Sequence, residues 1–222
     1  MTKAVKATLL LLSLALLALF SVSCGTPGES TTPPEPAPLE ENGAETSPVV
    51  QPPSADAVLV VVCQEGFQDI EYNTVRQALT AAGRKVAVAA PQKATASGVS
   101  GTRVTPDFAL AEADASGYLA VVFIGGPGAD SLFDNQDAHR LAVEAIKQGE
   151  VLAAICLAPA ILARAGVLTG KRATVYPSAS SDLTAGGAIY TGNDVEVDGV
   201  IITASGPEAS SAFSRAIISV LE

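Results

Sequence analysis

One cysteine of this sequence stands where a covalent nucleophile would stand. Cys156 follows the apolar run "VLAAI" and precedes "LAPAILARAG", so it lies at a tight turn between a strand and a helix. Such a turn, a nucleophile elbow, exposes a side chain above the sheet. The N-terminus of the following helix lends positive potential there, which favours a thiolate. We therefore take Cys156 as the candidate nucleophile, with an inert buried thiol as the alternative.

Two further stretches come directly after apolar strands. "EGFQDIE" carries Glu65 and Glu71, and "IGGPGA" carries Gly125 and Gly126. The carboxyl ends of parallel strands meet at one edge of a sheet, so these groups should lie near Cys156. The two glycines could turn their backbone amides towards a ligand, or they could form an ordinary turn. Their loop lacks the Lys and the Ser or Thr of a phosphate-binding loop, which argues against nucleotide binding.

The elements that would position these residues alternate along the chain. Apolar runs typical of strands are "AVLVVVC", "KVAVAA", "YLAVVFIGG", "VLAAIC", "RATVYP" and "VIITAS". Helical spacing predicts helices in "DIEYNTVRQALTAAG", "DAHRLAVEAIKQG", "APAILARAG" and "PEASSAFSRAIISVLE", the first of them capped by Asp69. A hairpin is expected through "IYTGNDVEVDG". This alternation predicts an α/β fold with a doubly wound, mostly parallel sheet flanked by helices, a flavodoxin-like sandwich.

Residues 1–24 have the layout of an export signal. Lys3 and Lys6 precede an apolar run, residues 9–20, and small residues then lead to Cys24. The run is short for a spanning helix, and no basic cluster follows it. The ending resembles a bacterial lipoprotein signal, although Ser21 replaces the usual Leu. It implies that lipid on Cys24 anchors an exported chain to the outer face of the cell membrane or an envelope membrane, with plain secretion or retained anchoring as alternatives.

Residues 25–56 have the composition of a disordered tether. They are dense in Pro, Glu, Ser and Thr, contain no Lys or Arg, and include six acidic residues. Such a segment cannot bury enough apolar surface to offset its ordering entropy. The chain has a formal net charge of −10 and no basic patch, which argues against nucleic acid as a partner. Residues 57–222 are long enough for one domain with its own core.

The domain resembles the ThiJ/PfpI superfamily, including its DJ-one-like branch, within the class I glutamine-amidotransferase-like fold. The blocks that carry the resemblance are "GFQDIEYNTVRQALTAAGRKVAVAA", "VVFIGGPGADSL", "VLAAICLAPAILARAGVLTGKRATVYPS" and "VIITASGPEASSAFSRAIISVLE". The resemblance implies that Cys156 is the elbow cysteine and that Glu71 is the carboxylate approaching its thiol. It also implies oxyanion donors at the backbone amides of Gly125, Gly126 and Leu157. Without the resemblance, Glu71 could be an ordinary first-turn acid of a helix.

The sequence departs from the protease-like members of that family. Those members carry a His directly after the cysteine, where this chain has Leu157, so a Cys-His hydrolase cannot use that position. Tyr176 stands where some relatives place a later His, and we include it as an auxiliary residue because it can donate a hydrogen bond. The single histidine, His139, is expected on a helix surface, with a catalytic role as the alternative. One His and no paired Cys predict no metal site, and we expect no cofactor.

Two functions are compatible with these residues. In the first, Cys156 attacks a small carbonyl compound or adduct, in the manner of the family's glyoxalase and deglycase members, and Glu71 shuttles the proton. In the second, Cys156 is the redox- or ligand-sensing thiol of a stress-response protein, which a small oxidant oxidises without turnover. A cysteine peptidase or amidase ranks third, because no His follows the cysteine. The resemblance also implies a homo-oligomer, a dimer or larger.

The sequence contains a second domain thiol, Cys63, which ends an apolar strand and should pack as a small apolar group. We therefore expect Cys156 to be the more reactive thiol. The protonation state of Glu71 determines how reactive Cys156 is. An ionised carboxylate beside the sulfur raises the pKa of the thiol, whereas a protonated carboxyl group can donate a hydrogen bond and lower that pKa. We predict the protonated form, because a desolvated carboxyl group is pushed towards neutrality.

Overall fold

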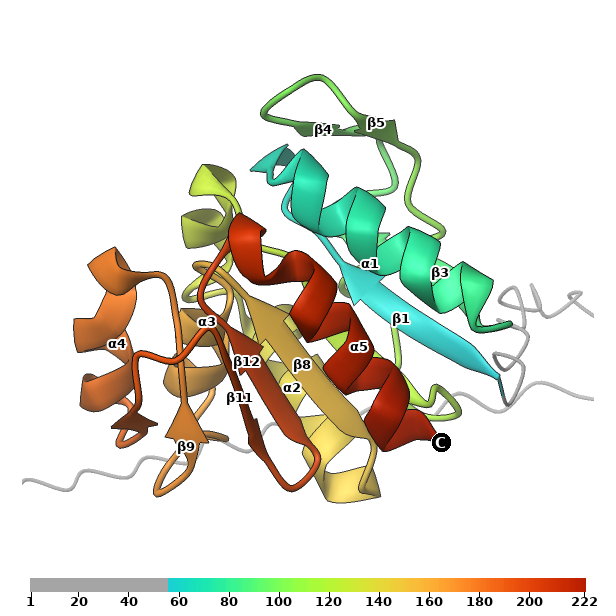
Figure 1. Ribbon diagram of the computed structural model, residues 1–222. Coiled ribbons are helices and arrows are strands. Elements are labelled where there is room, and N and C mark those ends of the chain that lie inside the picture. Colours follow the sequence, from blue (N-terminus) through green and yellow to red (C-terminus); the bar gives the residue numbers. More distant parts are fainter. Residues whose placement is uncertain (1–55) are drawn as a thin grey trace, which may run out of the picture. The chain divides into compact units, whose positions relative to one another are not determined.

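The computed structural model describes residues 56–222, so the predicted signal at 1–24 and the tether up to residue 55 lie outside the described residues. A seven-stranded sheet forms the centre of the domain (Figure 1). In spatial order its strands are β11 (Val195–Asp198), β12 (Ile201–Ala204), β8 (Val151–Ile155), β7 (Ala120–Phe123), β1 (Ala57–Val61), β3 (Lys85–Ala90) and β6 (Phe108–Ala109). All neighbours are parallel except β11 and β12.

Helices cover both faces of this sheet, which confirms the predicted doubly wound α/β fold. The α-helices are α1 (Asp69–Ala81), α2 (Gln136–Gln148), α3 (Pro159–Arg164), α4 (Ser180–Ala185) and α5 (Ser210–Leu221). The 3-10 helices are η1 (Pro127–Leu132), η2 (Pro177–Ala179) and η3 (Pro207–Ala209). The α1 and α5 helices lie side by side over one face, and α2 and α3 pack on the other (Figure 1).

The middle of the sheet is the core of the domain. Every residue of β1, β7 and β8 is buried, which explains why these segments read as continuous apolar runs rather than alternating ones. The three strands are neighbours in the order β8, β7, β1. Their carboxyl ends therefore meet at one edge of the sheet, and this edge holds the residues picked out for chemistry.

Two small sheets accompany the main one, and one of them corrects the predicted hairpin. A hairpin does form near residues 189–199, but its strands are β11 and β12, which turn at Gly199. The upstream strand β10 (Ile189–Tyr190) instead pairs in parallel with β9 (Arg172–Ala173). The third sheet joins β2 (Glu65–Phe67), β4 (Ala96–Gly98) and β5 (Arg103–Val104).

Asp69 is not the cap of α1. The side chain of Gln68 accepts the hydrogen bond from the amide of Ile70 at the start of that helix. The Asp69 carboxylate instead accepts from the amides of Ser100 and Thr102, at 2.7 and 2.8 Å, which ties the β4–β5 turn to α1. Within residues 56–222, no helix combines the length and the apolar character that crossing a membrane would need.

Candidate active site

Cys156 occupies a strained turn directly after β8. Its φ angle is 62°, and it is the only non-glycine residue with a positive φ within residues 56–222. Such a backbone is costly for a residue with a side chain and persists only where neighbours hold it. Two hydrogen bonds do so: the Cys156 amide donates to the carbonyl of Ala204 at 2.9 Å, and the Cys156 carbonyl accepts from the amide of Tyr176 at 2.8 Å.

Glu71 lies beside this turn although it comes from a distant part of the chain. It sits in the first turn of α1 and is fully buried. The amide of Gly125 donates to its Oε2 at 2.9 Å. Its Oε1 is buried and has no hydrogen-bond partner of ordinary geometry among the described residues. The nearby thiol of Cys156 is the remaining group that interacts with this carboxyl.

Gly125 differs from its predicted role. A Cβ atom at this position would lie 2.5 Å from the Cβ of Cys156 and 2.6 Å from the carbonyl oxygen of Ile155, so a side chain cannot fit. Because its amide already donates to Glu71, that amide is not free to stabilise an oxyanion. The prediction for Gly125 is therefore corrected: the glycine positions Glu71 and makes room for the elbow.

The other two predicted donors lie at the sulfur. The amides of Gly126 and Leu157 both hydrogen-bond to the thiol of Cys156 and act to lower its pKa. They are outweighed, because desolvation and then the negative charge of Glu71 raise the pKa of Cys156 to about 12. The expected stabilised thiolate is thus a wrong prediction. The α3 helix is six residues long and starts three residues beyond Cys156. The positive potential at its N-terminus therefore does not offset the desolvation of the thiol.

Glu71 itself is shifted towards the protonated form. Desolvation raises the pKa of Glu71 from 4.5 to about 7, while the Gly125 amide and the Cys156 thiol oppose the shift. The predicted direction is therefore right, and near neutral pH the carboxyl group is poised between its two forms. Two negative charges on Glu71 and Cys156 would repel each other in this buried site, so the pair keeps one proton. The sulfur holds that proton when Glu71 is ionised. This arrangement can pass a proton from the thiol to Glu71 as the sulfur attacks an electrophile.

The remaining predicted residues lie around this pair or away from it. Tyr176 is 45% exposed, and among the described residues its hydroxyl makes no hydrogen bond to the thiol. Glu65 is exposed. His139 lies half-buried on α2, where its Nε2 contacts the carbonyl oxygen of Phe133 at 2.7 Å rather than any residue of the Cys156 site.

Cys63 lies deeper than Cys156. It is fully buried, whereas Cys156 keeps 7% of its surface exposed. Its thiol donates to the carbonyl of Glu65 at 3.2 Å, and desolvation raises its pKa to about 12. Because the pKa of both thiols is raised to about 12, the two cysteines differ mainly in their exposure to solvent. No group of three or more His, Cys, Asp or Glu side chains able to hold a metal ion occurs in the part of the chain that the structure describes.

A pocket of about 290 Å³ adjoins the elbow. Tyr176 and Ser205 line it. The amide of Tyr176 donates to the Cys156 carbonyl, and Ser205 follows Ala204, whose carbonyl accepts from the Cys156 amide. The pocket is lined mainly by apolar surface, with the carboxylates of Asp194 and Glu208 among its polar groups. Its size suits a small organic molecule, although Cys156 itself is not among the residues that line it.

Sequence reasoning missed the contacts that bring α1 to the glycine loop. The amide of Gln68 donates to the carbonyl of Gly125 at 2.9 Å. A Cβ atom on Gly126 would lie 2.4 Å from the carbonyl oxygen of Gly66 and 2.5 Å from the amide of Gln68. Gly66 and Gly126 therefore let two loops pack backbone against backbone, and the only sequence signal was glycine in both.

The family model described as DJ-1/PfpI family matches this chain over residues 56–220. The chain belongs to the DJ-1/PfpI family. An uncharacterised protein of Methanocaldococcus jannaschii is 35% identical over 168 residues, which are 74% of this chain and 82% of that protein. A deglycase of Pyrococcus abyssi is 29% identical over 164 residues, 74% of this chain and 99% of that enzyme.

Other members of the DJ-1/PfpI family agree with this placement. A glutathione-independent glyoxalase of Caenorhabditis elegans is 26% identical over 166 residues, 75% of this chain and 89% of that protein. The crystal structure of a ThiJ/PfpI domain protein from Brachyspira murdochii superposes with a TM-score of 0.74 at 31% identity, covering 76% of this chain and 98% of that one. The resemblance read from the sequence, in family and in fold, is confirmed.

Proposed function

We propose that this protein is a cysteine-dependent enzyme that acts on small carbonyl compounds or their adducts, as a glyoxalase or deglycase does. The observation that carries the proposal is the contact between the buried carboxyl of Glu71 and the thiol of Cys156, beside the amides of Gly126 and Leu157. Family relatives named deglycase and glyoxalase support the same class of reaction.

The first step is addition of the sulfur to the carbonyl carbon. As the C–S bond forms, ionised Glu71 takes the thiol proton and the carbonyl π electrons move to oxygen. The amides of Gly126 and Leu157, which already face the sulfur, donate to that oxygen. Glu71 then returns the proton to it, which leaves a neutral hemithioacetal. A pKa of about 7 suits Glu71 to both transfers near neutral pH.

An α-ketoaldehyde allows this adduct to go further. Glu71 removes the proton from the former aldehyde carbon, and the electron pair moves to the neighbouring oxygen, giving an enediolate. The hydroxyl proton of the hemithioacetal then passes by way of Glu71 to that neighbouring oxygen, and Glu71 returns a proton to the neighbouring carbon, giving a thioester. Water then hydrolyses the thioester to a 2-hydroxy acid and restores the Cys156 thiol, so the net reaction adds one water and consumes no oxidant. One carboxyl group serves every proton transfer.

Turnover of methylglyoxal and of glyoxal tests this proposal. The full chain is compared with Cys156→Ala, which removes the nucleophile, and with Cys63→Ala, which removes the other domain thiol. We expect 2-hydroxy acid production that disappears in Cys156→Ala and persists in Cys63→Ala. No turnover by the unaltered chain, or equal turnover in Cys156→Ala, would refute the proposal that this protein is a cysteine-dependent enzyme.

One observation favours a second function. Among the described residues, Glu71 is the only titratable side chain that affects the pKa of Cys156, so a single group must act as base and acid. If turnover is absent, a sensing thiol remains: peroxide oxidises the sulfur to a sulfenic acid with release of water, and a second equivalent gives a sulfinic acid. Peroxide-treated protein would then carry oxygen on Cys156, seen by peptide mass analysis. Peptidase or amidase chemistry stays third, because Leu157 follows the cysteine.

The proposal includes a place and an assembly state. The signal-like residues 1–24 support lipid attachment at Cys24 and a location on the outer face of a membrane. Resemblance to a family with oligomeric members supports a homo-oligomer. Light scattering of the purified chain should give a mass of two or more copies, and a monomer at micromolar concentration would contradict that part.

A further inference from the structure

A second pocket lies between α1, β3 and β5, and none of the residues placed at the Cys156 site lines it. Its volume is about 290 Å³, and most of its lining surface is polar. The residues that line it are Tyr72, Arg76, Val86, Val88, Arg103, Val104, Thr105 and Asp107. The proposed reaction gives these side chains no role.

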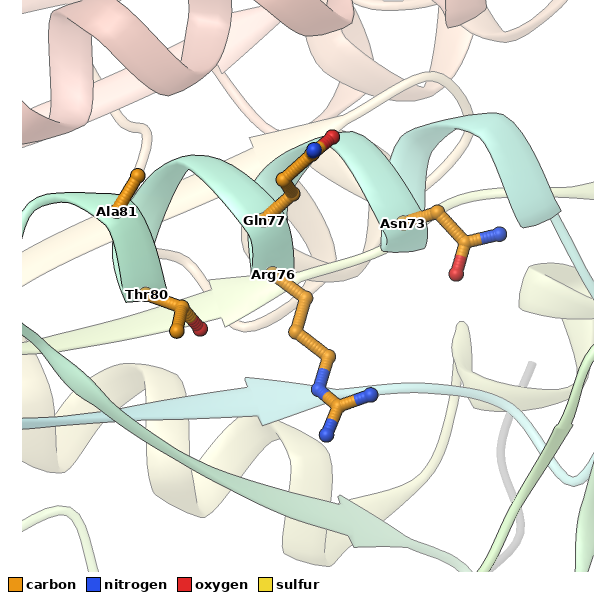
Figure 2. Close-up of a pocket in the computed structure, with 5 residues that line it drawn as sticks. All are labelled: Asn73, Arg76, Gln77, Thr80 and Ala81. Atoms are coloured by element: carbon orange, nitrogen blue, oxygen red, sulfur yellow. The ribbon is translucent and has the colours of Figure 1, made fainter.

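Two guanidinium groups in this pocket have no partner. Arg76 comes from α1 and Arg103 from β5, and neither makes an ion pair or a side-chain hydrogen bond with any other residue in 56–222. Figure 2, a close-up of another pocket on α1, shows Arg76 extending from that helix in the direction opposite to Gln77. The chain has 23 acidic residues against 13 Lys and Arg, so carboxylates are plentiful. Both side chains are exposed to solvent, so an anion that enters the pocket meets two guanidinium groups that no carboxylate occupies.

Tyr72 gives a second, independent sign of a ligand. The residue is 2% exposed, its ring packs against Phe67 with centroids 5.4 Å apart, and it lines this pocket. No hydrogen bond within residues 56–222 involves its hydroxyl, and this oxygen is not among the buried polar atoms that lack a partner, so it is open to the pocket. Arg76 and Asp107 line the same pocket as Tyr72. Desolvation raises the pKa of Tyr72, the charge of Arg76 opposes this shift, and the charge of Asp107 adds to it.

Asp107 is the one acidic side chain in the lining, and its carboxylate is already engaged. Its Oδ2 accepts from the amide of Val88 at 2.8 Å, and its own amide donates to the Val88 carbonyl at 2.8 Å. These bonds fasten Asp107 to β3. The lining therefore carries a net charge of one positive, from two Arg and one Asp, together with the hydroxyls of Tyr72 and Thr105 as donors.

We propose that this pocket binds a small oxyanion, with a phosphate group as its best-matched form. Guanidinium forks bind phosphate and carboxylate oxygens in pairs, and the hydroxyl of Tyr72 supplies a further donor. A dianionic phosphate balances the charge of two guanidinium groups, whereas a single carboxylate carries one negative charge. The bound anion joins α1 to β5, and α1 also carries Glu71.

Titration calorimetry of the full chain with inorganic phosphate, at constant ionic strength, tests the site. We expect a dissociation constant in the range of about 1 mM or tighter, and binding about tenfold weaker in Arg76→Gln and in Arg103→Gln. Tyr72→Phe keeps the ring and removes only the hydroxyl, so it should weaken binding several-fold with the fold intact. Acetate and succinate in place of phosphate distinguish a carboxylate ligand from a phosphate ligand.

Arg215→Gln is the matched control, because it removes the same charge from α5, outside the pocket. It should leave phosphate affinity within about twofold of that of the unaltered chain. Circular dichroism of each variant reports whether it folds. Absence of phosphate binding to the unaltered chain, or equal weakening by Arg215→Gln and Arg103→Gln, would overturn the proposal. Tighter binding of succinate than of phosphate would reject phosphate as the preferred form.

Discussion

The amide of Gly125 donates to Oε2 of Glu71 at 2.9 Å, and the space beside the same glycine is filled by the elbow. Gly125 thus orients the carboxyl group of Glu71 and, because it has no side chain, leaves room for Cys156. The hydrogen bond favours the ionised carboxylate and opposes its desolvation, which keeps the pKa of Glu71 near 7. Without it, Glu71 would remain protonated over a wider pH range and would be a poorer base.

Gly125→Ala should damage both the fold and the site. The new Cβ would stand 2.5 Å from that of Cys156, closer than real carbon atoms pack, so the backbone must shift. We expect a loss of about 2–4 kcal/mol in the free energy of unfolding and at least a tenfold loss of any methylglyoxal turnover. Denaturant unfolding and the turnover assay measure the two effects.

Gly206→Ala is the control for that substitution. Its Cβ would meet only the ring of Tyr176, at 3.2 Å from Cδ2 and 3.7 Å from Cε2, and this exposed ring can move aside. The expected cost is below about 1 kcal/mol. Equal costs in Gly125→Ala and Gly206→Ala would show that the close approach at Gly125 is not what restricts the position.

Burial of Glu71 predicts how stability depends on pH. Its pKa is 4.5 unperturbed and about 7 in the folded chain, so the folded state binds the proton more tightly. Stability from this group is therefore complete below about pH 4.5 and falls as pH rises to about 7, by ~3 kcal/mol in total. Glu71→Gln should flatten that part of the curve, measured by denaturant unfolding between about pH 5 and about pH 8.

Glu150 must be separated from this effect. Desolvation, with the charges of Asp114 and Glu144, also raises its pKa to about 7, and it is only half-buried. Glu150→Gln should therefore flatten the curve less than Glu71→Gln does, because solvent screens a half-exposed group. If Glu150→Gln alone removed the whole pH dependence, Glu71 would not be the buried group responsible.

The fold was predictable because its strands are buried on both faces. The segments of β1, β7 and β8 read as unbroken apolar runs, and that pattern alone implies a parallel sheet covered by helices. The short strands were not predictable in the same way. The β9 and β10 strands have two residues each, too few to show alternation. The predicted hairpin near residue 195 therefore paired β10 with β11, whereas β11 pairs with β12.

The site was predictable in its members but not in its electrostatics. Strand ends placed Cys156, Glu71 and the glycine loop at one edge, because topology dictates that edge. Whether the thiol is ionised depends on burial and on the carboxyl group beside it, which are tertiary properties. The amide of Gly125 was assigned to the oxyanion for the same reason: a sequence shows that an amide exists, not which acceptor it meets.

Arg164 should stabilise the α3–α4 side of the domain. Its guanidinium donates to Asp134 at 2.9 Å and to Asp182 at 2.8 Å, and it lies 4.9 Å from the ring centroid of Phe133. Arg164→Gln should lower the free energy of unfolding by about 1 kcal/mol, since the pairs are partly exposed. High salt should shrink the difference, measured by thermal unfolding; a difference unchanged by salt would mean that packing, not charge, is responsible.

Lipid attachment is expected at Cys24. The cationic, apolar and small-residue order before it predicts cleavage that leaves this cysteine as the first residue. Intact-mass analysis of membrane-extracted protein should show an acylated chain starting at Cys24, and Cys24→Ala should release the protein from the membrane fraction. A soluble chain that retains Met1 contradicts this expectation.

The charge of Glu71 should control how fast Cys156 reacts. Ionised Glu71 is second only to desolvation in raising the pKa of this thiol, so above about pH 7 the carboxylate holds the sulfur in its unreactive form. Glu71→Gln removes the charge and leaves an amide that can donate to a thiolate. Alkylation of Cys156 by iodoacetamide at about pH 8 should therefore become at least about tenfold faster. Glu71→Leu removes the charge without supplying a donor, so its rate should lie between those of the unaltered chain and Glu71→Gln.

Cys63 is the internal reference for this measurement. It is fully buried and does not contact Glu71, so its labelling should be slower than that of Cys156 and the same in all three proteins. Peptide mass analysis after timed labelling separates the two thiols. Faster labelling of Cys63 than of Cys156 would contradict the exposure argument. Equal Cys156 rates in the three proteins at about pH 8 would show that the carboxylate does not govern the thiol, and the proton transfer proposed for Glu71 would fail with it.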